Sequence, residues 1–214
     1  MFITLEGVEG AGKSTQIPRL RAWLEEMGLT VLVSREPGGS PLGRMIRPLL
    51  LDIRNQDLSP EGELFLYMAD RAQHVRQVLL PALAADQIIL CDRFADSTVA
   101  YQGYGRGVDI EQLTAMNKLA QAGLSPDLTL LFDLDVELGL RRARQRNARE
   151  GMSESEGRFE AEELDFHRRV RQGYLDLARQ YAWRYRIVDA ARCPDLVFER
   201  ACTYIAAALA GNSV

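Results

Sequence analysis

A glycine-rich segment near the start of the chain constrains its fold more than any other feature. Residues 7–14 read GVEGAGKS and fit the pattern G-x-x-x-x-G-K-[ST], between an apolar run at residues 2–5 and a helical pattern. Strand, loop and helix in this order are the context of a phosphate-binding P-loop, whose backbone N–H groups converge on phosphate oxygens at a helix N-terminus. The chain is therefore predicted to bind ATP or GTP.

The motif also indicates which side chains of the loop take part in the chemistry. Lys13 is expected to reach the β- and γ-phosphates as a catalytic cation, and the Ser14 hydroxyl is expected to hold Mg²⁺. A glycine-rich turn that only joins a strand to a helix is the structural alternative, and the complete motif in its context disfavours it. The predicted ATP-binding residues are Gly7, Val8, Glu9, Gly10, Ala11, Gly12, Lys13, Ser14 and Thr15.

Strand-like and helix-like patterns alternate along the chain, which is typical of a parallel sheet covered by helices. Further strands are predicted at residues 30–34, 87–91, 128–134 and 185–188, and helices after the P-loop, over 59–80 with Pro81 just past its end, after Asp135 and from about 194. The expected fold class is α/β of the P-loop NTPase type, with three layers (α/β/α), a five-stranded parallel sheet and an arginine-rich lid. No repeat or shift in composition marks a boundary, so residues 1–214 are predicted to form a single domain.

Charge and cysteine content narrow the partners and the compartment. The net charge of −4 argues against a nucleic-acid polymer as partner, because such proteins usually carry a large basic surface. The three cysteines are scattered and lack C-x-x-C spacing, so neither a disulfide framework nor a zinc site is indicated, and a reducing cytoplasm is expected. No leader precedes the first strand and no apolar run is long enough for a membrane span, so no membrane association is expected.

Several polar segments follow the predicted strands directly. In open α/β sheets, ligands bind beyond the carboxyl ends of the strands. The loops expected at those ends contain the P-loop, residues 35–40, the pair Asp92-Arg93 and the segment around Asp189. One shared site is therefore predicted at that edge of the sheet.

Two further segments suggest a second ligand beside the nucleotide. Tyr67 and Arg71 stand four residues apart and so share a helix face. Taken alone, a core tyrosine beside a solvated arginine is the favoured interpretation of that pair. Residues 97–107 are rich in glycine and hydroxyl side chains, which suits a loop that wraps a small ligand, and a flexible surface loop is the alternative.

Arginines crowd a predicted helix and the segment that follows it, from Arg141 to Arg158. Charge runs usually mean a solvated helix face. Beside a nucleotide, however, an arginine-rich flap would exclude water and neutralise the transferred phosphoryl group. A lid is predicted at about residues 142–158, with Arg142, Arg146, Arg149 and Arg158 as catalytic candidates.

A combination of motifs is more specific than the P-loop alone. It comprises Glu9 inside the P-loop, residues 35–39 (REPGG), residues 69–74 (ADRAQH), Asp92-Arg93 and residues 100–107 (AYQGYGRG). With these motifs the chain resembles the thymidylate kinase family nearly end to end. The acidic P-loop residue and the arginines in the flap resemble the bacterial subtype, in which the flap supplies the catalytic cation.

The resemblance implies an enzyme that phosphorylates dTMP to dTDP with ATP·Mg²⁺ as donor, for dTTP and DNA synthesis. It also implies a homodimer built on the long helices. In this interpretation Arg93 and Arg47 grip the monophosphate, and Glu9 lies near the sugar 3′-hydroxyl. Arg93 and Glu9 are therefore catalytic candidates beside Lys13 and the lid arginines.

The same resemblance assigns the base and sugar contacts. Tyr67 stacks on thymine, Arg71 reaches a thymine carbonyl and Thr98 reads the base edge. Tyr101 lies under the deoxyribose, where its ring leaves no space for a 2′-hydroxyl. The full predicted dTMP-binding set is Glu9, Arg35, Pro37, Arg47, Tyr67, Arg71, Arg93, Ser97, Thr98, Tyr101 and Gln102.

Some positions depart from the family pattern or keep two interpretations. Relatives commonly have phenylalanine where this chain has Tyr67, and an acid where Gly157 precedes Arg158. Asp92 is a predicted metal residue beside Ser14, and it either orients Mg²⁺ through water or holds Arg93.

Two other classes of protein compete with this interpretation. A uridylate or guanylate kinase would keep the P-loop and the flap but need another base pocket. A GTPase would normally offer N-K-x-D, whereas residues 117–120 read NKLA and lack the aspartate. A motor ATPase would need an acidic pair at a strand end, whereas Arg93 follows Asp92 here.

Overall fold

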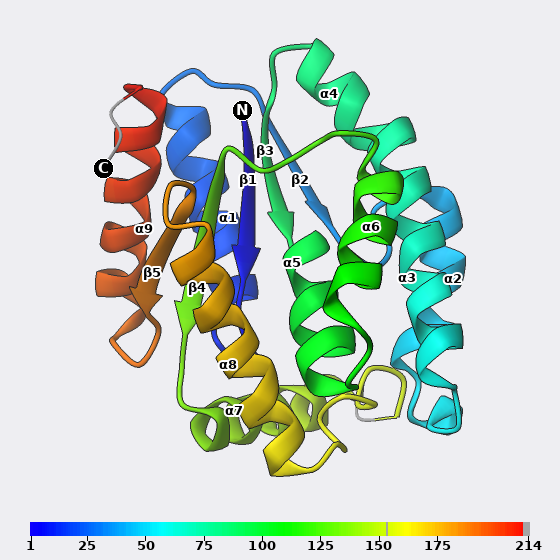
Figure 1. The fold of residues 1–214 in the computed structure, drawn as a ribbon. Helices are drawn as coiled ribbons and strands as arrows, with labels where there is room; N and C mark the ends of the chain where they lie inside the picture. Colours follow the sequence, from blue (N-terminus) through cyan, green and yellow to red (C-terminus); the bar gives the residue numbers. More distant parts are fainter. Residues whose placement is uncertain (153, 212–214) are drawn as a thin grey trace.

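Five parallel strands form the centre of the molecule, in the order β2-β3-β1-β4-β5 (Figure 1). They are β1 (Phe2–Glu6), β2 (Val31–Arg35), β3 (Ile88–Asp92), β4 (Leu128–Asp133) and β5 (Tyr185–Asp189). The computed structural model describes residues 1–152 and 154–211; residue 153 of the expected lid and residues 212–214 of the expected domain lie outside the described residues. The predicted three-layer fold around a five-stranded parallel sheet is confirmed.

The strands are built from apolar runs because helices cover both faces of the sheet. The three inner strands β1, β3 and β4 are almost wholly buried, while the edge strands β2 and β5 are partly exposed. Leu5 of β1 lies opposite Asp92 on one side and Leu130 on the other. This register brings the carboxyl ends of all strands to one edge, the lower one in Figure 1.

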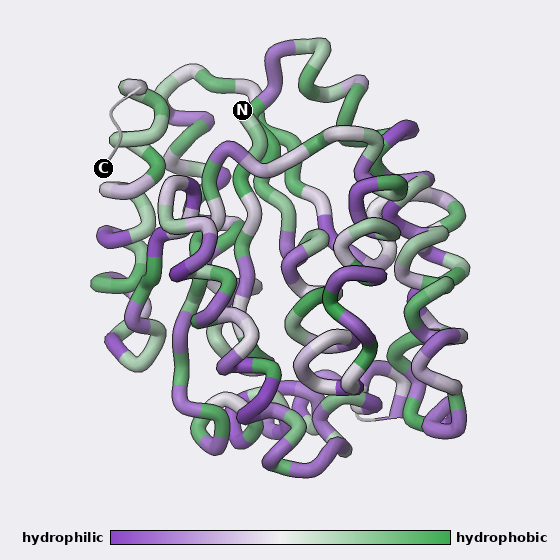
Figure 2. Tube along the Cα trace, viewed as in Figure 1, coloured by the Kyte–Doolittle hydropathy of each residue, from purple (hydrophilic) through white to green (hydrophobic). Residues whose placement is uncertain are grey.

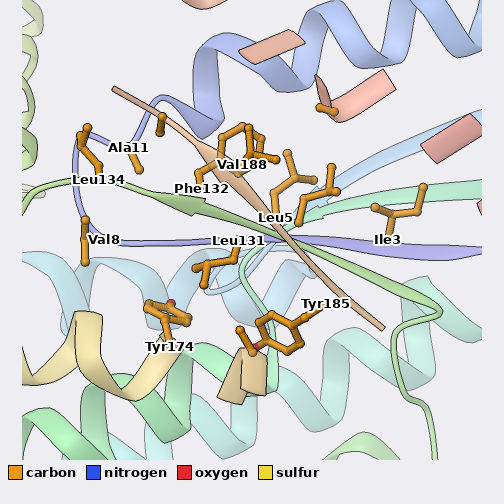
Figure 3. Packing of buried hydrophobic residues seen from close by; sticks show 14 of the residues in the cluster. Ile3, Leu5, Val8, Ala11, Leu131, Phe132, Leu134, Tyr174, Tyr185 and Val188 are labelled. Carbon is orange, nitrogen blue, oxygen red and sulfur yellow. The ribbon is translucent and has the colours of Figure 1, made fainter. Parts of the chain in front are cut away.

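Helices pack on the two faces of the sheet. The helices α1 (Lys13–Glu26) and α9 (Pro194–Leu209) cover one face, and α8 (Leu164–Gln180) lies on the opposite face (Figure 1). Figure 3 shows Phe132 and Val188 on one side of the sheet and Leu131 and Tyr174 on the other. The remaining elements are α2 (Pro41–Leu51), η1 (Ile53–Asn55), α3 (Pro60–His74), η2 (Val75–Leu79), α4 (Leu80–Ala84), α5 (Ala95–Thr98), η3 (Val99–Gly105), α6 (Ile110–Gln121) and α7 (Val136–Glu150).

The helix predicted over residues 59–80 differs from the structure at its end. It begins with the Ser59 cap as expected, but the helical run continues through η2, a π-helical turn, into α4. Pro81 therefore lies inside the run and not past its end. A proline ring clashes with the carbonyl four residues earlier in a regular helix, and the wider π-helical turn directly before Pro81 relieves that crowding.

Three helices, α2, α6 and α8, and one helical segment were not predicted. The helix α2 begins at the Ser40 cap, whose Oγ accepts from the Gly43 N–H at 2.9 Å, and α6 begins at Asp109 in the same way. Residues 97–107 are predicted as a loop, but most of them are helical, in α5 and η3, and buried. The alternative interpretation as a flexible surface loop is therefore wrong. Within the described residues, no helix is long and apolar enough to cross a membrane.

A buried ion pair joins the start of β5 to the segment after β3. Arg184 donates from its NH1 to Asp96 Oδ2 and Thr129 Oγ1, both at 2.6 Å, and from its NH2 to Asp96 Oδ1 at 2.9 Å. Both charged side chains are almost fully buried. The pair is therefore shielded from water, and each charge depends on the other.

We expect Arg184→Ala to lower the free energy of unfolding by about 3–5 kcal/mol, because Asp96 would remain buried without its partner. The control is Arg179→Ala, whose side chain is 73% exposed and pairs with Asp176, and whose loss should cost at most about 1 kcal/mol. Urea unfolding of both variants measures the difference. Equal effects of the two substitutions would contradict the expectation.

Candidate active site

A pocket of about 850 Å³ lies at the carboxyl ends of the strands. Its walls come from the P-loop, the ends of β2 and β3, the helices α3 and α7, η3, Met152 and the segments around residues 156–160 and 190–197. The predicted site residues in its lining are Glu9, Gly10, Ala11, Gly12, Lys13, Ser14, Thr15, Arg35, Pro37, Arg47, Tyr67, Arg71, Asp92, Arg93, Ser97, Thr98, Tyr101, Gln102, Arg142, Arg146 and Arg149. The lining does not include Gly7, Val8 or Arg158.

The P-loop wraps around the side chain of its own lysine. Gly12 precedes α1 with a left-handed φ of 89°, a conformation that costs glycine little. Lys13 Nζ donates to the carbonyl oxygens of Gly7 at 2.9 Å and Val8 at 3.3 Å. Burial, together with the nearby Arg93, lowers the pKa of Lys13 to about 8. Gly7 and Val8 thus support Lys13 from beneath the pocket floor.

The helix α7 begins directly against the P-loop. A Cβ on Gly10 would lie 2.0 Å from Gly139 O, and one on Gly139 would lie 2.5 Å from Glu9 O, so only glycines allow this contact. The helix then runs beneath the strand ends (Figure 1), and Figure 2 shows its hydrophilic colouring. Sequence reasoning missed Gly139, although a glycine inside a helical pattern often marks a close approach. The contact fixes the start of α7 against the P-loop, and so it fixes the position of the arginines that follow on this helix.

Arg93 is the central cation of the pocket. It follows β3 with a left-handed φ of 69°, and its guanidinium lies 4.9 Å from the ring centre of Tyr101. Its NH2 donates to Glu9 Oε1 at 3.1 Å, and its NH1 donates to the hydroxyls of Tyr174 at 3.0 Å and Ser97 at 3.3 Å. These three hydrogen-bond partners hold the Arg93 guanidinium in one orientation.

Glu9 is held as a carboxylate despite its burial. Burial alone would raise its pKa, but His167 and Arg93 hold the pKa well below its usual range. Glu9 Oε1 also accepts a hydrogen bond from the Tyr101 hydroxyl, and Oε2 lies 3.4 Å from His167 Nδ1. The sequence analysis did not single out His167, because nothing local distinguishes a buried histidine of α8 from a core residue.

Glu6 lies behind Arg93 at the end of β1. Its carboxylate accepts from the Phe94 N–H at 2.7 Å, from Ser97 Oγ at 2.6 Å and from the Tyr174 hydroxyl at 2.9 Å. Burial and the neighbouring Asp96 raise the pKa of Glu6 to about 7, although Ser97, Arg93 and Tyr174 act in the opposite direction. Glu6 was also missed, and the signal was an acid at the end of an otherwise apolar strand.

Tyr67 and Arg71 of α3 form the opposite wall of the pocket. Arg71 is only 1% exposed, and its Nε donates to Glu36 Oε2 at 2.8 Å while its NH1 donates to Thr98 Oγ1 at 2.9 Å. Asp70 of the same helix accepts from the Gly38 N–H at 3.1 Å, and burial with the nearby Glu36 raises the pKa of Asp70 to about 6. The motif at residues 35–39 is thereby fixed against α3.

Arg47 of α2 binds a carboxylate from the expected lid. Its Nε and NH2 donate to the two oxygens of Glu156 at 3.0 and 2.9 Å, and its NH1 donates to Pro37 O at 2.9 Å. The hydrogen bond and charge of Arg47 lower the pKa of Glu156, against the effect of burial. Arg47 therefore already binds an anion through two parallel hydrogen bonds.

The four expected lid arginines have different environments. Arg142 NH1 donates to Ala190 O at 3.1 Å, Arg146 pairs with Glu160 at 3.6 Å, and Arg149 is mostly exposed. The sequence predicts that Arg158 faces the transferred phosphate. In the structure its side chain is instead buried, with its NH1 2.5 Å from Glu63 Oε2. It also donates to Leu50 O and Asn55 O. It thus anchors the segment after α7 to α2 and α3.

The oxygen ligands at the P-loop fit a hard cation. Asp92 Oδ1 is buried without a hydrogen-bond partner, and the Ser14 side chain is exposed on the pocket lining. Mg²⁺ prefers oxygen ligands and usually keeps several waters while bound to phosphates. No cluster of three or more His, Cys, Asp or Glu suited to a metal occurs among residues 1–152 and 154–211. The oxygens of Ser14 and Asp92 suit a cation that phosphate oxygens help to hold.

Comparisons with known proteins identify close similarities over nearly the whole chain. The model of the family described as thymidylate kinase matches residues 5–201. A thymidylate kinase of Nitratidesulfovibrio vulgaris (strain Miyazaki F) is 61% identical over 93% of both chains, and one of Oleidesulfovibrio alaskensis is 58% identical over 96% of this chain and 97% of the relative. The crystal structure of thymidylate kinase from Ehrlichia chaffeensis superposes with a TM-score of 0.76 at 31% identity, covering 96% of this chain and 98% of that one.

The raised pKa of Glu6 makes stability depend on pH. A carboxyl group with a pKa of about 7 in the folded protein and an ordinary pKa of 4.5 in the unfolded chain binds its proton more tightly when folded, so the free energy of unfolding falls as pH rises between these values. The contribution is on the order of 3 kcal/mol. We therefore expect Glu6→Gln to be more destabilising at pH 5 than at pH 8.

Urea unfolding of wild type and Glu6→Gln at both pH values measures this difference. Comparing the two proteins at each pH cancels the titration of groups that they share. Glu25→Gln, a change at an exposed residue of α1, serves as the control and should have the same small effect at both pH values. A pH-independent effect of Glu6→Gln would show that Glu6 is ionised in both the folded and the unfolded protein between pH 5 and pH 8.

Proposed function

The chain belongs to the thymidylate kinase family, and we propose that its pocket is where it phosphorylates dTMP to dTDP with ATP. This reaction serves the synthesis of dTTP for DNA. One observation carries the assignment of the site. A single pocket has the P-loop lysine in one wall and the pair Tyr67 and Arg71 in another, with Arg93 at the strand end also in its lining.

We assign the donor phosphates to the P-loop. Its backbone N–H groups and Lys13 would bind the β- and γ-phosphates, because the loop presents donors and a helix N-terminus together. Ser14 and Asp92 would hold Mg²⁺, which supplies charge neutralisation at the phosphates when bound. The unpartnered Asp92 Oδ1 supports the interpretation in which Asp92 serves the metal and not Arg93.

We assign the acceptor phosphate to Arg93 and Arg47, with Arg35 beside them. The two-pronged contact of Arg47 with Glu156 supports this role, because a phosphate offers the same pair of oxygens. Glu9 and Tyr101 would lie against the sugar, since the Tyr101 hydroxyl donates to Glu9 and both line the pocket.

We assign the thymine ring to the wall formed by α3, α5 and η3. Tyr67 would stack on the base, Arg71 would donate to a base carbonyl and Thr98 would contact the base edge. The remaining predicted contacts, Pro37, Ser97 and Gln102, line the same pocket, and Gln102 Nε2 donates to Glu63 Oε1 at 2.7 Å.

These assignments define what the protein does during the reaction. An oxygen of the dTMP phosphate attacks the γ-phosphorus in line, and the bond to the β-phosphate oxygen breaks, so no protein nucleophile is needed. The arginines and Lys13 position the two anions and reduce their repulsion. The lid excludes water, which would otherwise accept the phosphoryl group.

We further propose that residues 1–214 form one domain in which residues 142–158 act as the lid. Arg142, Arg146 and Arg149 line the pocket and are the arginines best placed to meet the donor phosphates. Arg158 would have to leave Glu63 to join them.

We also propose a homodimer in a reducing cytoplasm. Exposed apolar side chains on α2 support the dimer, because Leu42, Met45 and Leu49 follow helical spacing on one face, and exposed Phe65 lies on neighbouring α3. The three cysteines are free, as expected of a reducing compartment.

A monophosphate panel tests the proposed function. We expect ADP release with dTMP to exceed that with dUMP, UMP, GMP and AMP, and preference for another monophosphate would overturn the assignment of the base pocket.

We expect Arg93→Ala to raise the Kd for dTMP roughly ten- to a hundredfold with little change for thymidine, because the lost hydrogen bonds meet the phosphate. Equal weakening of both ligands would make Arg93 structural.

The lid arginines are tested by replacing Arg142, Arg146, Arg149 and Arg158 singly with alanine. At one or two of these positions kcat should fall, on the order of 10³-fold for an arginine that stabilises the transition state, with little change in the KM for dTMP. Arg141→Ala on the same helix is the matched control, because Arg141 lies outside the pocket lining. Normal turnover in all four variants would remove the catalytic role of the lid.

A further inference from the structure

We propose that Asn117 of α6, which does not line the pocket, is a positioning residue that sets base selectivity by fixing Arg71. The inference rests on the proposed contact between Arg71 and the base. Asn117 entered the sequence analysis only as part of an incomplete guanine motif. The structure gives the same residue a different partner.

The amide of Asn117 is held in one orientation between two groups. Its Oδ1 accepts from Arg71 NH1 at 2.6 Å, and its Nδ2 donates to Ala95 O at 3.3 Å. A guanidinium can only donate and a backbone carbonyl can only accept, so the opposite orientation of the amide would break both contacts. Asn117 is 4% exposed, which leaves water little access to either contact.

The hydrogen bonds of Arg71 leave a single donor for a ligand. A guanidinium has five N–H groups, and four of them are engaged, by Glu36, Thr98, Asn117 and the Phe94 carbonyl. The remaining N–H belongs to NH2, and Arg71 is in the pocket lining. Arg71 therefore presents one donor in a fixed direction, which suits one carbonyl oxygen of the base and opposes an amino group there.

A buried chain of contacts fixes the other end of Arg71. Glu36 Oε1 lies 2.9 Å from His74 Nδ1, and His74 Nε2 lies 2.6 Å from Ser34 Oγ. This chain and Asn117 hold the guanidinium from two sides. Without the Asn117 oxygen, an NH1 hydrogen would be buried and unpaired, so the guanidinium would turn toward another acceptor and misdirect its last donor.

The test compares dTMP with 5-methyl-dCMP, which keeps the methyl group, sugar and phosphate. Its base differs in having an amino group in place of the 4-carbonyl oxygen and no proton on N3. The measured quantity is the ratio of kcat/KM for dTMP to that for 5-methyl-dCMP. In Asn117→Leu, leucine fills the space of the amide and keeps water from replacing its oxygen. We expect this ratio to fall roughly ten- to a hundredfold, mainly through the KM for dTMP.

Two further variants separate selectivity from stability. Leu113→Ala removes a fully buried side chain one turn earlier on α6, in the apolar cluster with Leu64 and Met68, and should leave the ratio at the wild-type value. If Leu113→Ala lowered the ratio as much as Asn117→Leu, general loosening of α6 would explain the effect and the inference would be overturned. Should Asn117→Leu fail to fold, Asn117→Ser takes its place with the same expected fall, because its hydroxyl is too short to keep the contact.

Arg71→Lys distinguishes failure of the inference from failure of the proposed function. If wild type does not prefer dTMP, or if Arg71→Lys keeps the wild-type ratio, the proposed base contact of Arg71 is wrong and the inference falls with it. If Arg71→Lys abolishes the preference while the Asn117 variants keep it, only the inference is overturned. A fall in both supports the positioning role of Asn117.

Discussion

The positive charge of the half-buried Arg93 is the constraint on which the site depends. A charge partly removed from water needs ionic and hydrogen-bonding partners, and here those partners come from the P-loop, α5 and α8. Glu6 in turn holds two of those partners, Ser97 and Tyr174. Segments distant in the sequence are thus tied to one guanidinium at the end of β3, so the geometry of the pocket depends on the packing of the whole sheet.

The pairing of arginines with carboxylates reconciles the acidic chain with a pocket for two anions. Arg71 pairs with Glu36, Arg93 with Glu9, Arg47 with Glu156 and Arg158 with Glu63. Three of these carboxylates, Glu36, Glu9 and Glu156, line the pocket themselves. An incoming phosphate therefore meets donors whose directions are already set, but it competes with carboxylates for them. Selectivity then depends on geometry more than on net charge.

Local patterns predicted the strands, the P-loop and the loops that carry the site, because apolar runs and glycine motifs are properties of neighbouring residues. Local patterns did not predict the roles of residues whose partners are distant in the sequence. Glu6 and Tyr174 are 168 positions apart, and Arg71 and Asn117 are 46 apart, so no local signal connects them. The cap residues Ser40 and Asp109 did give local signals for α2 and α6, and both were overlooked.

The contact between Gly10 and Gly139 determines where the molecule can bend. Because the two backbones are in contact, we expect the P-loop and the first turns of α7 to move as one rigid body, which is the stationary end of the helix. Arg142, one turn past the contact, belongs to that stationary end. Arg149, near the last residue of α7, lies at the other end of the helix, next to Gly151 with its left-handed φ of 69°. If residues 142–158 act as the proposed lid, Arg142 therefore stays with the P-loop, and Arg149 is the α7 arginine farthest from this fixed contact.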